Sequence, residues 1–223
     1  MTSPSSPIDS PSAAPASDTG GLILIGRVVR LQVQTSPLKQ GERPRRWYSP
    51  DAITSVPAIR IDSGGVTGHD GESVLADVHH RDHPLSRFRG DNGVSVGFTA
   101  HYDAMRARFG GFLHDGIAGE SLLVASDRIF TEDDLSGGIV IVTEGGTVDL
   151  MAVQVAPPCV EFGKFCLRYP HDRAADSQVA AAVAFLHQGM RGFYATWKPD
   201  DGTMSSPRIA IGDLAYRRSG GAS

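Results

Sequence analysis

The sequence has few cysteines, no basic excess and no long apolar segment. Only two of its 223 residues are cysteines, Cys159 and Cys166. A secretory signal would place basic residues before an apolar core, but the first basic residue, Arg27, follows the apolar run "LILI". Few cysteines and no signal predict the reducing cytoplasm. No apolar run reaches the ~20 residues of a membrane helix, so we expect no membrane association.

The net charge and the composition of the first twenty residues further limit the expected partners and domain boundaries. A formal net charge of −4 argues against a nucleic-acid partner, which usually requires a basic face. Residues 1–20 are rich in Ser, Pro and Ala and have too few large apolar side chains to offset the entropy of ordering, so they are predicted to be a disordered tail. With 40% hydrophobic residues, the remainder can bury a core. We predict one domain over residues 21–218 and a short disordered tail over 219–223.

Most of this domain has the pattern of short strands and turns. The run Leu22–Gln34 is apolar and β-branched, and Gly26 interrupts it where a bulge is expected. "SVPAIRID" alternates apolar and polar residues, and two β-branched runs flank Gly145-Gly146 as in a hairpin. Further strands are predicted in four segments: "GGVTGHDGESVLADVHHRDHP", "ESLLVAS", "GFYATW" and "PRIAIGDLAY".

Two segments have helical patterns instead. In "GFTAHYDAMRARFGG", Thr99 is a plausible N-cap, apolar residues recur at helical spacing, and Gly110 ends the run. "DSQVAAAVAFLHQG" begins with Asp176 or Ser177 as a cap and ends at Gly189. Many short strands with two helices predict a mainly β fold with α insertions, as a barrel or a sandwich.

The two cysteines allow several kinds of chemistry. Seven residues of extended strand span about 23 Å, too far for a disulfide, and a tight hairpin would place Phe162 where a positive φ is often needed. Structural zinc is disfavoured because no Cys-x2–4-Cys spacing exists, although Cys159 could join the histidines at 79, 80 and 83. A cysteine–histidine hydrolase and two buried structural cysteines stay open as alternatives.

The immediate neighbours distinguish Cys159 from Cys166. Pro157 and Pro158 stiffen the backbone before Cys159 and remove two N–H donors, which suits a thiol at the rim of a pocket. Cys166 lies between Phe165 and Leu167 in an apolar run and is predicted to be packing only.

Several motifs together resemble the MOSC domain, the C-terminal domain type of molybdenum cofactor sulfurases, which also occurs as stand-alone bacterial proteins. The resemblance runs from about Gly21 to Arg218. The matching pieces come in the family's order: "GGVTGHDG", "DVHH", "AHYDAMRARFG", "GIAGESLLV", "VAPPCVEFGKF", "GMRGFYATW" and "IAIGD". Each piece is weak alone, but their order is hard to obtain by chance. The chain departs from the family at Ser121, where Asn is common, and at His69, where the early glycine loop usually shows Gly-Asp, which leaves the ligand's identity open.

The resemblance implies a MOSC-type β-barrel that handles the molybdenum cofactor or the sulfur destined for it. The family cysteine maps onto Cys159, which would carry a persulfide sulfur or ligate molybdenum directly; both roles require a thiolate. The pterin carries a phosphate and an anionic dithiolene, so cations and backbone N–H groups should line its pocket. The candidate binding residues are Arg27, Lys39, Arg60, His80, Lys164 and Arg191, and Glu120 is a candidate for orienting the pocket. Arg191 stands out because it lies between Gly189 and Gly192, which would let a ligand approach the backbone.

Three functions follow as hypotheses. The first is molybdenum-cofactor binding or sulfur relay through Cys159. For sulfur relay we expect a cysteine desulfurase, which would carry the pyridoxal phosphate, as the sulfur donor and a molybdoenzyme as the acceptor. The second is a molybdenum-dependent reductase of N-oxygenated compounds that takes electrons from an external redox partner. The third is a non-catalytic binding module that keeps only the barrel.

Overall fold

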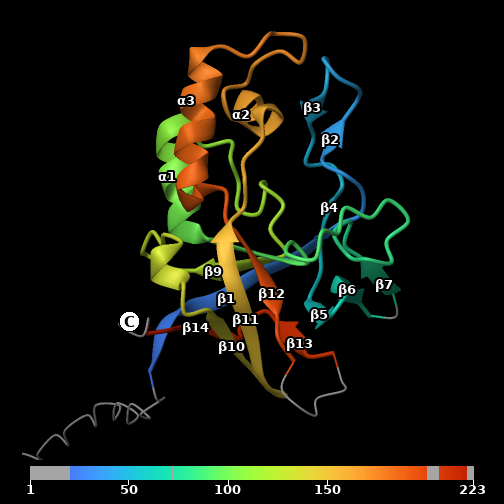
Figure 1. The fold of residues 1–223 in the computed structure, drawn as a ribbon, viewed down its shortest axis with the longest axis vertical. Helices are drawn as coiled ribbons and strands as arrows, with labels where there is room; N and C mark the ends of the chain where they lie inside the picture. The colour runs from blue at the N-terminus through green and yellow to red at the C-terminus, as the bar shows by residue number, and fades with distance from the viewer. Residues whose placement is uncertain (1–20, 72, 200–205, 220–223) are drawn as a thin grey trace, which may run out of the picture.

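The computed structural model describes residues 21–71, 73–199 and 206–219, so the predicted tails lie outside or at the margin of the described residues. A closed barrel of seven strands forms the centre of the molecule (Figure 1). Going round the barrel, the strands are β14 (Leu214–Arg218), β10 (Ile139–Thr143), β11 (Gly146–Val155), β12 (Phe193–Trp197), β8 (Val94–Phe98), β9 (Leu122–Ala125) and β1 (Leu22–Gln34). Pairing of β1 with β14 closes the ring.

The strand β1 takes part in three pairings because it is long and bent. It spans the predicted run Leu22–Gln34, and its register with β14 shifts between Leu24 and Gly26. A Cβ at Gly26 would lie 1.8 Å from the carbonyl oxygen of Ala125, so only glycine fits this bulge. Beyond the barrel, β1 pairs with β4 (Ile53–Ser55).

Two smaller β elements flank the barrel. A four-stranded sheet contains, in order, β13 (Arg208–Ala210), β5 (Ala58–Asp62), β6 (Gly65–Asp70) and β7 (Ser73–Ala76). The strands β2 (Lys39–Gln40) and β3 (Trp47–Tyr48) form a two-stranded arm on the side facing the helices (Figure 1). The predicted mainly β fold with α insertions is therefore confirmed, as a barrel.

Three helices gather at one end of the barrel (Figure 1). They are α1 (Thr99–Phe109), α2 (Val160–Cys166) and α3 (Ser177–Phe185); the 3₁₀ turn η1 (Asp133–Leu135) and the irregular turn η2 (Leu186–Met190) are short. Asp176 caps α3 by accepting hydrogen bonds from the N–H groups of Gln178 and Val179, as predicted. The prediction of Thr99 as the cap of α1 was wrong by one residue: Phe98 is the cap, and the Thr99 hydroxyl donates to the carbonyl of Ser126.

The segment around the cysteines also differs from expectation. The strand β11 ends at Val155, and Cys159 begins the helix α2, which the sequence analysis did not predict. Its Sγ accepts a hydrogen bond from the N–H of Phe162 at 3.4 Å. Both cysteines are free, and a disulfide is absent from the described residues, as expected.

Apolar side chains form two cores, one inside the barrel and one among the helices. The first contains Val28, Leu31, Phe98 and Phe193, and the second contains Tyr102, Met105, Phe162 and Leu186. Cys166 belongs to the second core, where it is 1% exposed. No helix in the described part of the chain is long and apolar enough to cross a membrane.

Candidate functional site

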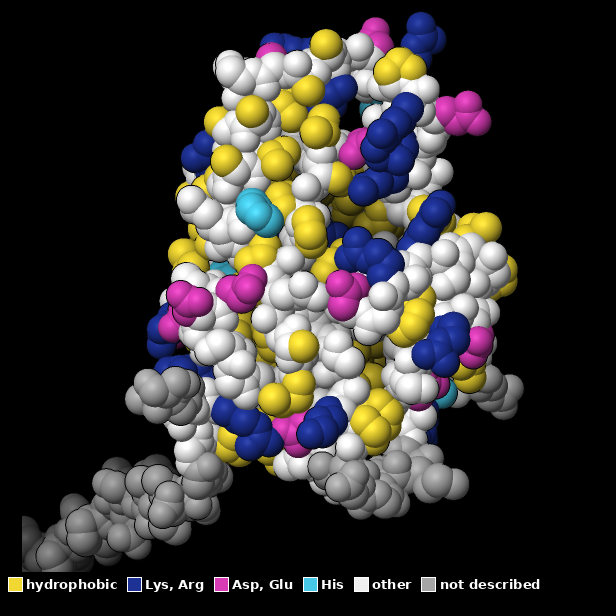
Figure 2. Space-filling model, in the orientation of Figure 1, with side chains coloured by type: hydrophobic (Ala, Val, Ile, Leu, Met, Phe, Trp, Pro, Cys, Tyr) yellow, Lys and Arg dark blue, Asp and Glu magenta, His cyan; other side chains and the backbone are white. Residues whose placement is uncertain are grey.

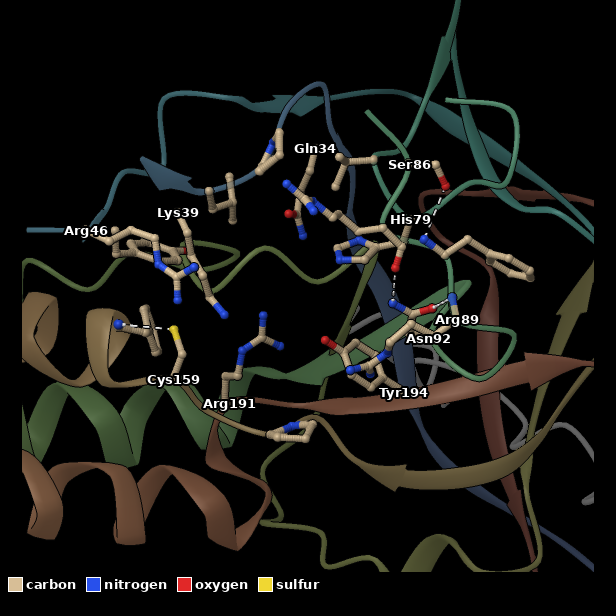
Figure 3. A pocket seen from close by; sticks show the side chains of 18 residues that line it. Gln34, Lys39, Arg46, His79, Ser86, Arg89, Asn92, Cys159, Arg191 and Tyr194 are labelled. Carbon is tan, nitrogen blue, oxygen red and sulfur yellow. Dashed lines mark hydrogen bonds between the residues drawn. The ribbon is translucent and has the colours of Figure 1, made fainter. Parts of the chain in front are cut away.

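The main cavity found in the described residues lies where the helices, the β2–β3 arm and the barrel meet. Its volume is about 540 Å³, within the range of small-molecule sites. Cys159 lines it from the start of α2, Arg191 from the turn before β12, and Lys39 from β2. Figure 3 shows Cys159, Lys39 and Arg46 at one end, Tyr194 and His79 towards the other, and Arg191 between them. Three residues predicted from sequence thus come together here.

The walls of this cavity are strongly basic. Its lining includes five cationic side chains and no carboxylate: Lys39, Arg46, Arg87, Arg89 and Arg191. Arg46 is paired with Glu161 at 2.7 Å and Arg89 with Asp91 at 3.6 Å. Arg87, Arg191 and Lys39 form no ion pair among the described residues, so their charge is available to an anionic ligand. In Figure 2, Lys and Arg side chains gather beside the hollow between the helices and the β2–β3 arm.

Arg191 is held in place by groups behind the cavity. Its Nη2 donates to the carbonyl of Ala118 at 3.1 Å. Burial on its own would lower the pKa of Arg191, but the ionisable Tyr194 and Glu120 nearby raise the pKa above its ordinary value, so the guanidinium stays charged. The cavity therefore keeps one fixed positive charge near the thiol of Cys159.

Glu120 does not line the cavity but lies buried behind it, 1% exposed. The hydroxyl of Tyr102 donates to its two carboxylate oxygens at 2.9 and 2.7 Å. Burial raises the pKa of Glu120, whereas the Tyr102 hydrogen bond and the charge of Arg191 oppose this rise. Glu120 therefore interacts electrostatically with Arg191 from behind the cavity and is not part of the cavity's lining.

The glycines around Arg191 serve packing. A Cβ at Gly192 would lie 2.8 Å from the carbonyl oxygen of Val96 and 3.1 Å from Cγ of Glu120. A Cβ at Gly189 would lie 2.7 Å from the Phe193 ring. The expectation that these glycines open the backbone to a ligand was therefore wrong, because protein atoms occupy the space.

The three other candidate cations and the histidine lie elsewhere. Arg60 on β5 is exposed and donates to the carbonyl of Ser206, and Arg27 donates to the carbonyl of Gly212. Lys164 lines a second cavity. His80 is 5% exposed and turned to Asp62, 3.2 Å away, outside the main cavity. Arg46, which the sequence analysis did not single out, lines both cavities.

The neighbouring His79 lines the cavity instead of His80. The buried Asp77 carboxylate lies 2.9 Å from Nδ1 of His79 and also accepts the His79 backbone N–H at 2.8 Å. These bonds fix the ring and leave Nε2 for the cavity. The Asp-x-His spacing of "DVHH" was the sequence signal for this pair, but it did not reveal which histidine faces the cavity.

The two departures from the family pattern lie outside this lining. Ser121 is buried, and its N–H donates to Oγ of Ser95 at 2.9 Å. His69 lies on β6, with Thr67 Oγ1 3.4 Å away. No cluster of three or more His, Cys, Asp or Glu side chains suited to a metal occurs among the described residues, which disfavours a zinc site built on the histidines at 79, 80 and 83.

The fold and cavity define a class: β-barrel proteins with a thiol in a cation-lined cavity at one end of the barrel. No family model matches the chain, and no curated protein matches it either. The fold is similar to the crystal structure of the YuaD protein from Bacillus subtilis, with a TM-score of 0.50, 14% identity, and coverage of 87% of this chain and 94% of that one. YiiM from Geobacillus stearothermophilus is similar at a TM-score of 0.44 and 16% identity, covering 90% of this chain and 77% of that one. At 14% identity the likeness to YuaD concerns the fold alone.

Proposed function

We propose that this protein is a MOSC-type barrel that binds the molybdenum cofactor in the cavity of Cys159. The observation that carries the proposal is the lining: one thiol and five cationic side chains, with no carboxylate. A ligand that is both anionic and able to bind a soft sulfur donor suits such a cavity. The order of motifs that resembles the MOSC family supports the choice of ligand.

The residues present fit this cofactor. Arg191, Lys39 and Arg87 would hold its anionic groups, and the rings of Tyr48 and Phe162 line the wall beside Cys159. When bound, the cofactor would supply a molybdenum centre that is already held by dithiolene sulfurs. One thiolate from the protein would complete such a site, which agrees with a single cysteine in the lining.

The proposal gives Cys159 two alternative roles. Cys159 would present its sulfur as a molybdenum ligand, or carry a sulfane sulfur for transfer to the cofactor. In the carrier version, a cysteine desulfurase with its own pyridoxal phosphate is the proposed donor and a molybdoenzyme the proposed acceptor. Reduction of N-oxygenated compounds would instead require an external redox partner.

A non-catalytic module is less well supported, because the departures that motivated it do not touch the cavity. Ser121 and His69 both lie outside the lining. The cavity contains a thiol and five cations, which weakens the reason to expect a binding module that has lost the chemistry.

The test is to purify the protein from cells that make the molybdenum cofactor and to measure bound molybdenum and pterin. We expect about one molybdenum per chain, lost in Cys159→Ala and kept in Cys166→Ala, if Cys159 is a ligand. Cyanide-labile sulfur on Cys159 without stoichiometric molybdenum would support the carrier version. Absence of molybdenum, pterin and labile sulfur from the wild type would refute the proposal.

A further inference from the structure

A second cavity, of about 310 Å³, shares Arg46 and Tyr48 with the cavity of Cys159. It lies between the β2–β3 arm and α2, and neither the fold nor the proposed function assigns it a role. Besides Tyr48, five ring side chains line it: Trp47, Phe112, Phe165, Tyr169 and His171. The Trp47 and His171 ring centroids are 5.1 Å apart. Walls of this kind favour a flat aromatic ligand.

The charges around this cavity favour an anion. Arg46 neutralises the one lining carboxylate, Glu161, at 2.7 Å. Burial would raise the pKa of Glu161, but Arg46 lowers that pKa below its ordinary value, so the pair stays ionised. Lys164 and Arg168 also line the cavity and form no ion pair within the described part of the chain, which leaves a net positive charge.

Arg168 has a left-handed backbone conformation, which is unfavourable for a residue other than glycine. It follows α2 with φ of +55°, and the N–H groups of Arg168 and Tyr169 return to the carbonyls of Phe165 and Lys164. This is a Schellman motif, in which glycine is the favoured residue at the left-handed position. An arginine is less favourable than glycine at this position, because its Cβ crowds the backbone in the left-handed conformation.

The arginine side chain offers a reason for this cost. Its guanidinium lies over the Phe112 ring, 4.6 Å from the centroid, at the wall of the second cavity. A cation stacked on an aromatic ring is oriented for an anion on a flat ligand. The side chain thus supplies the cavity with a charge that glycine would not.

We propose that the second cavity binds a planar aromatic anion, with the ring among the aromatic side chains and the negative group at Arg168 and Lys164. The inference rests on this cavity's own residues and does not depend on molybdenum in the first. The ligand has two sources to distinguish: a free aromatic acid and a nucleotide.

The binding test uses calorimetric titration with two probes, 2-naphthoate and guanosine 5′-monophosphate. We expect at least one probe to bind. If 2-naphthoate binds, two analogues should each bind at least tenfold more weakly. These are 2-naphthamide, which is aromatic but neutral, and cyclohexanecarboxylate, which is anionic but not aromatic. Tighter binding of 2-naphthoate identifies a free aromatic acid, and tighter binding of the nucleotide identifies a nucleotide. If the wild type binds neither probe, or binds the neutral analogue as tightly as 2-naphthoate, the proposal is overturned.

The variant Arg168→Gly separates binding from folding. It should lower affinity for the bound probe at least tenfold, while its melting temperature stays equal to or above that of the wild type because glycine suits the backbone. Arg208→Ala removes an exposed cation on β13, remote from both cavities, and should leave the affinity unchanged within twofold. Undiminished affinity in Arg168→Gly, or an equal loss in Arg208→Ala, would contradict the assignment.

Discussion

Cys159 and Cys166 have different surroundings, although both belong to the segment that forms α2. Cys159 is partly exposed at the cavity, whereas Cys166 is buried in the helical core. Burial raises the pKa of Cys166 to about 12, so this residue stays a neutral thiol near pH 7.

This difference predicts selective alkylation. Iodoacetamide should add to one thiol per native chain, at Cys159, and to both thiols after unfolding, because Cys166 is not accessible in the native state. Intact mass spectrometry of the wild type, Cys159→Ala and Cys166→Ala measures the adducts. Labelling of the native Cys159→Ala variant at the wild-type rate would show that Cys166 is more accessible than its burial implies.

Individual site residues were only partly predictable from the sequence. Cys159, Arg191 and Lys39 were chosen by residue type and local context, and they do line one cavity. His79 was missed in favour of His80 because two adjacent residues point to opposite sides, and only the tertiary fold decides which side is the cavity. The role of Gly192 was misjudged because the atoms that fill its space, on Val96 and Glu120, come from distant parts of the chain.

At the scale of elements, strands with strong β-branched patterns were predicted well. The run Leu22–Gln34 forms β1 with its expected bulge at Gly26, and the hairpin around Gly145-Gly146 joins β10 to β11. The short helix α2 was missed. It is only seven residues long, contains Gly163 and follows two prolines, so the sequence shows no helical periodicity; the helix forms because Phe162 and Cys166 pack into the helical core.

The bulge at Gly26 predicts a test of barrel closure. Gly26→Ala should lower the free energy of unfolding by roughly 2 kcal/mol or more, since the new Cβ would overlap the carbonyl of Ala125 at a φ of +152°. Urea denaturation monitored by circular dichroism measures the change. Gly111→Ala is the matched control, because no heavy atom lies within 4 Å of its added Cβ, and it should stay within about 0.5 kcal/mol of the wild type.

At the scale of the whole molecule, one buried histidine makes the free energy of unfolding depend on pH. His101 donates from Nδ1 to the carbonyl of Gly189 and accepts the N–H of Phe130 at Nε2, each at 2.9 Å. Burial lowers its pKa from 6.5 to about 4, while the two backbone hydrogen bonds partly oppose this shift. The folded protein therefore holds a neutral imidazole that links α1 to the turn before Arg191.

The sign of the pH effect follows from the direction of this shift. Between pH 6.5 and about 4 the unfolded chain binds a proton at this histidine and the folded chain does not, so stability falls as the pH falls. The loss attributable to His101 should approach about 3 kcal/mol near pH 4. Urea denaturation at several pH values should show a shallower slope in His101→Gln than in the wild type, and an unchanged slope would contradict the prediction.

The closed barrel also determines which strands can pair with a strand of another molecule. Its seven strands pair with one another all the way round and so leave the ring without an unpaired edge. The four-stranded sheet does not close, and β7, one of its two outer strands, pairs only with β6 among the described residues, so its other side can accept a further strand. Val74 on that strand is 61% exposed. At high protein concentration, intermolecular strand addition should therefore begin at β7, on the side of the molecule away from the helices, before the barrel itself opens.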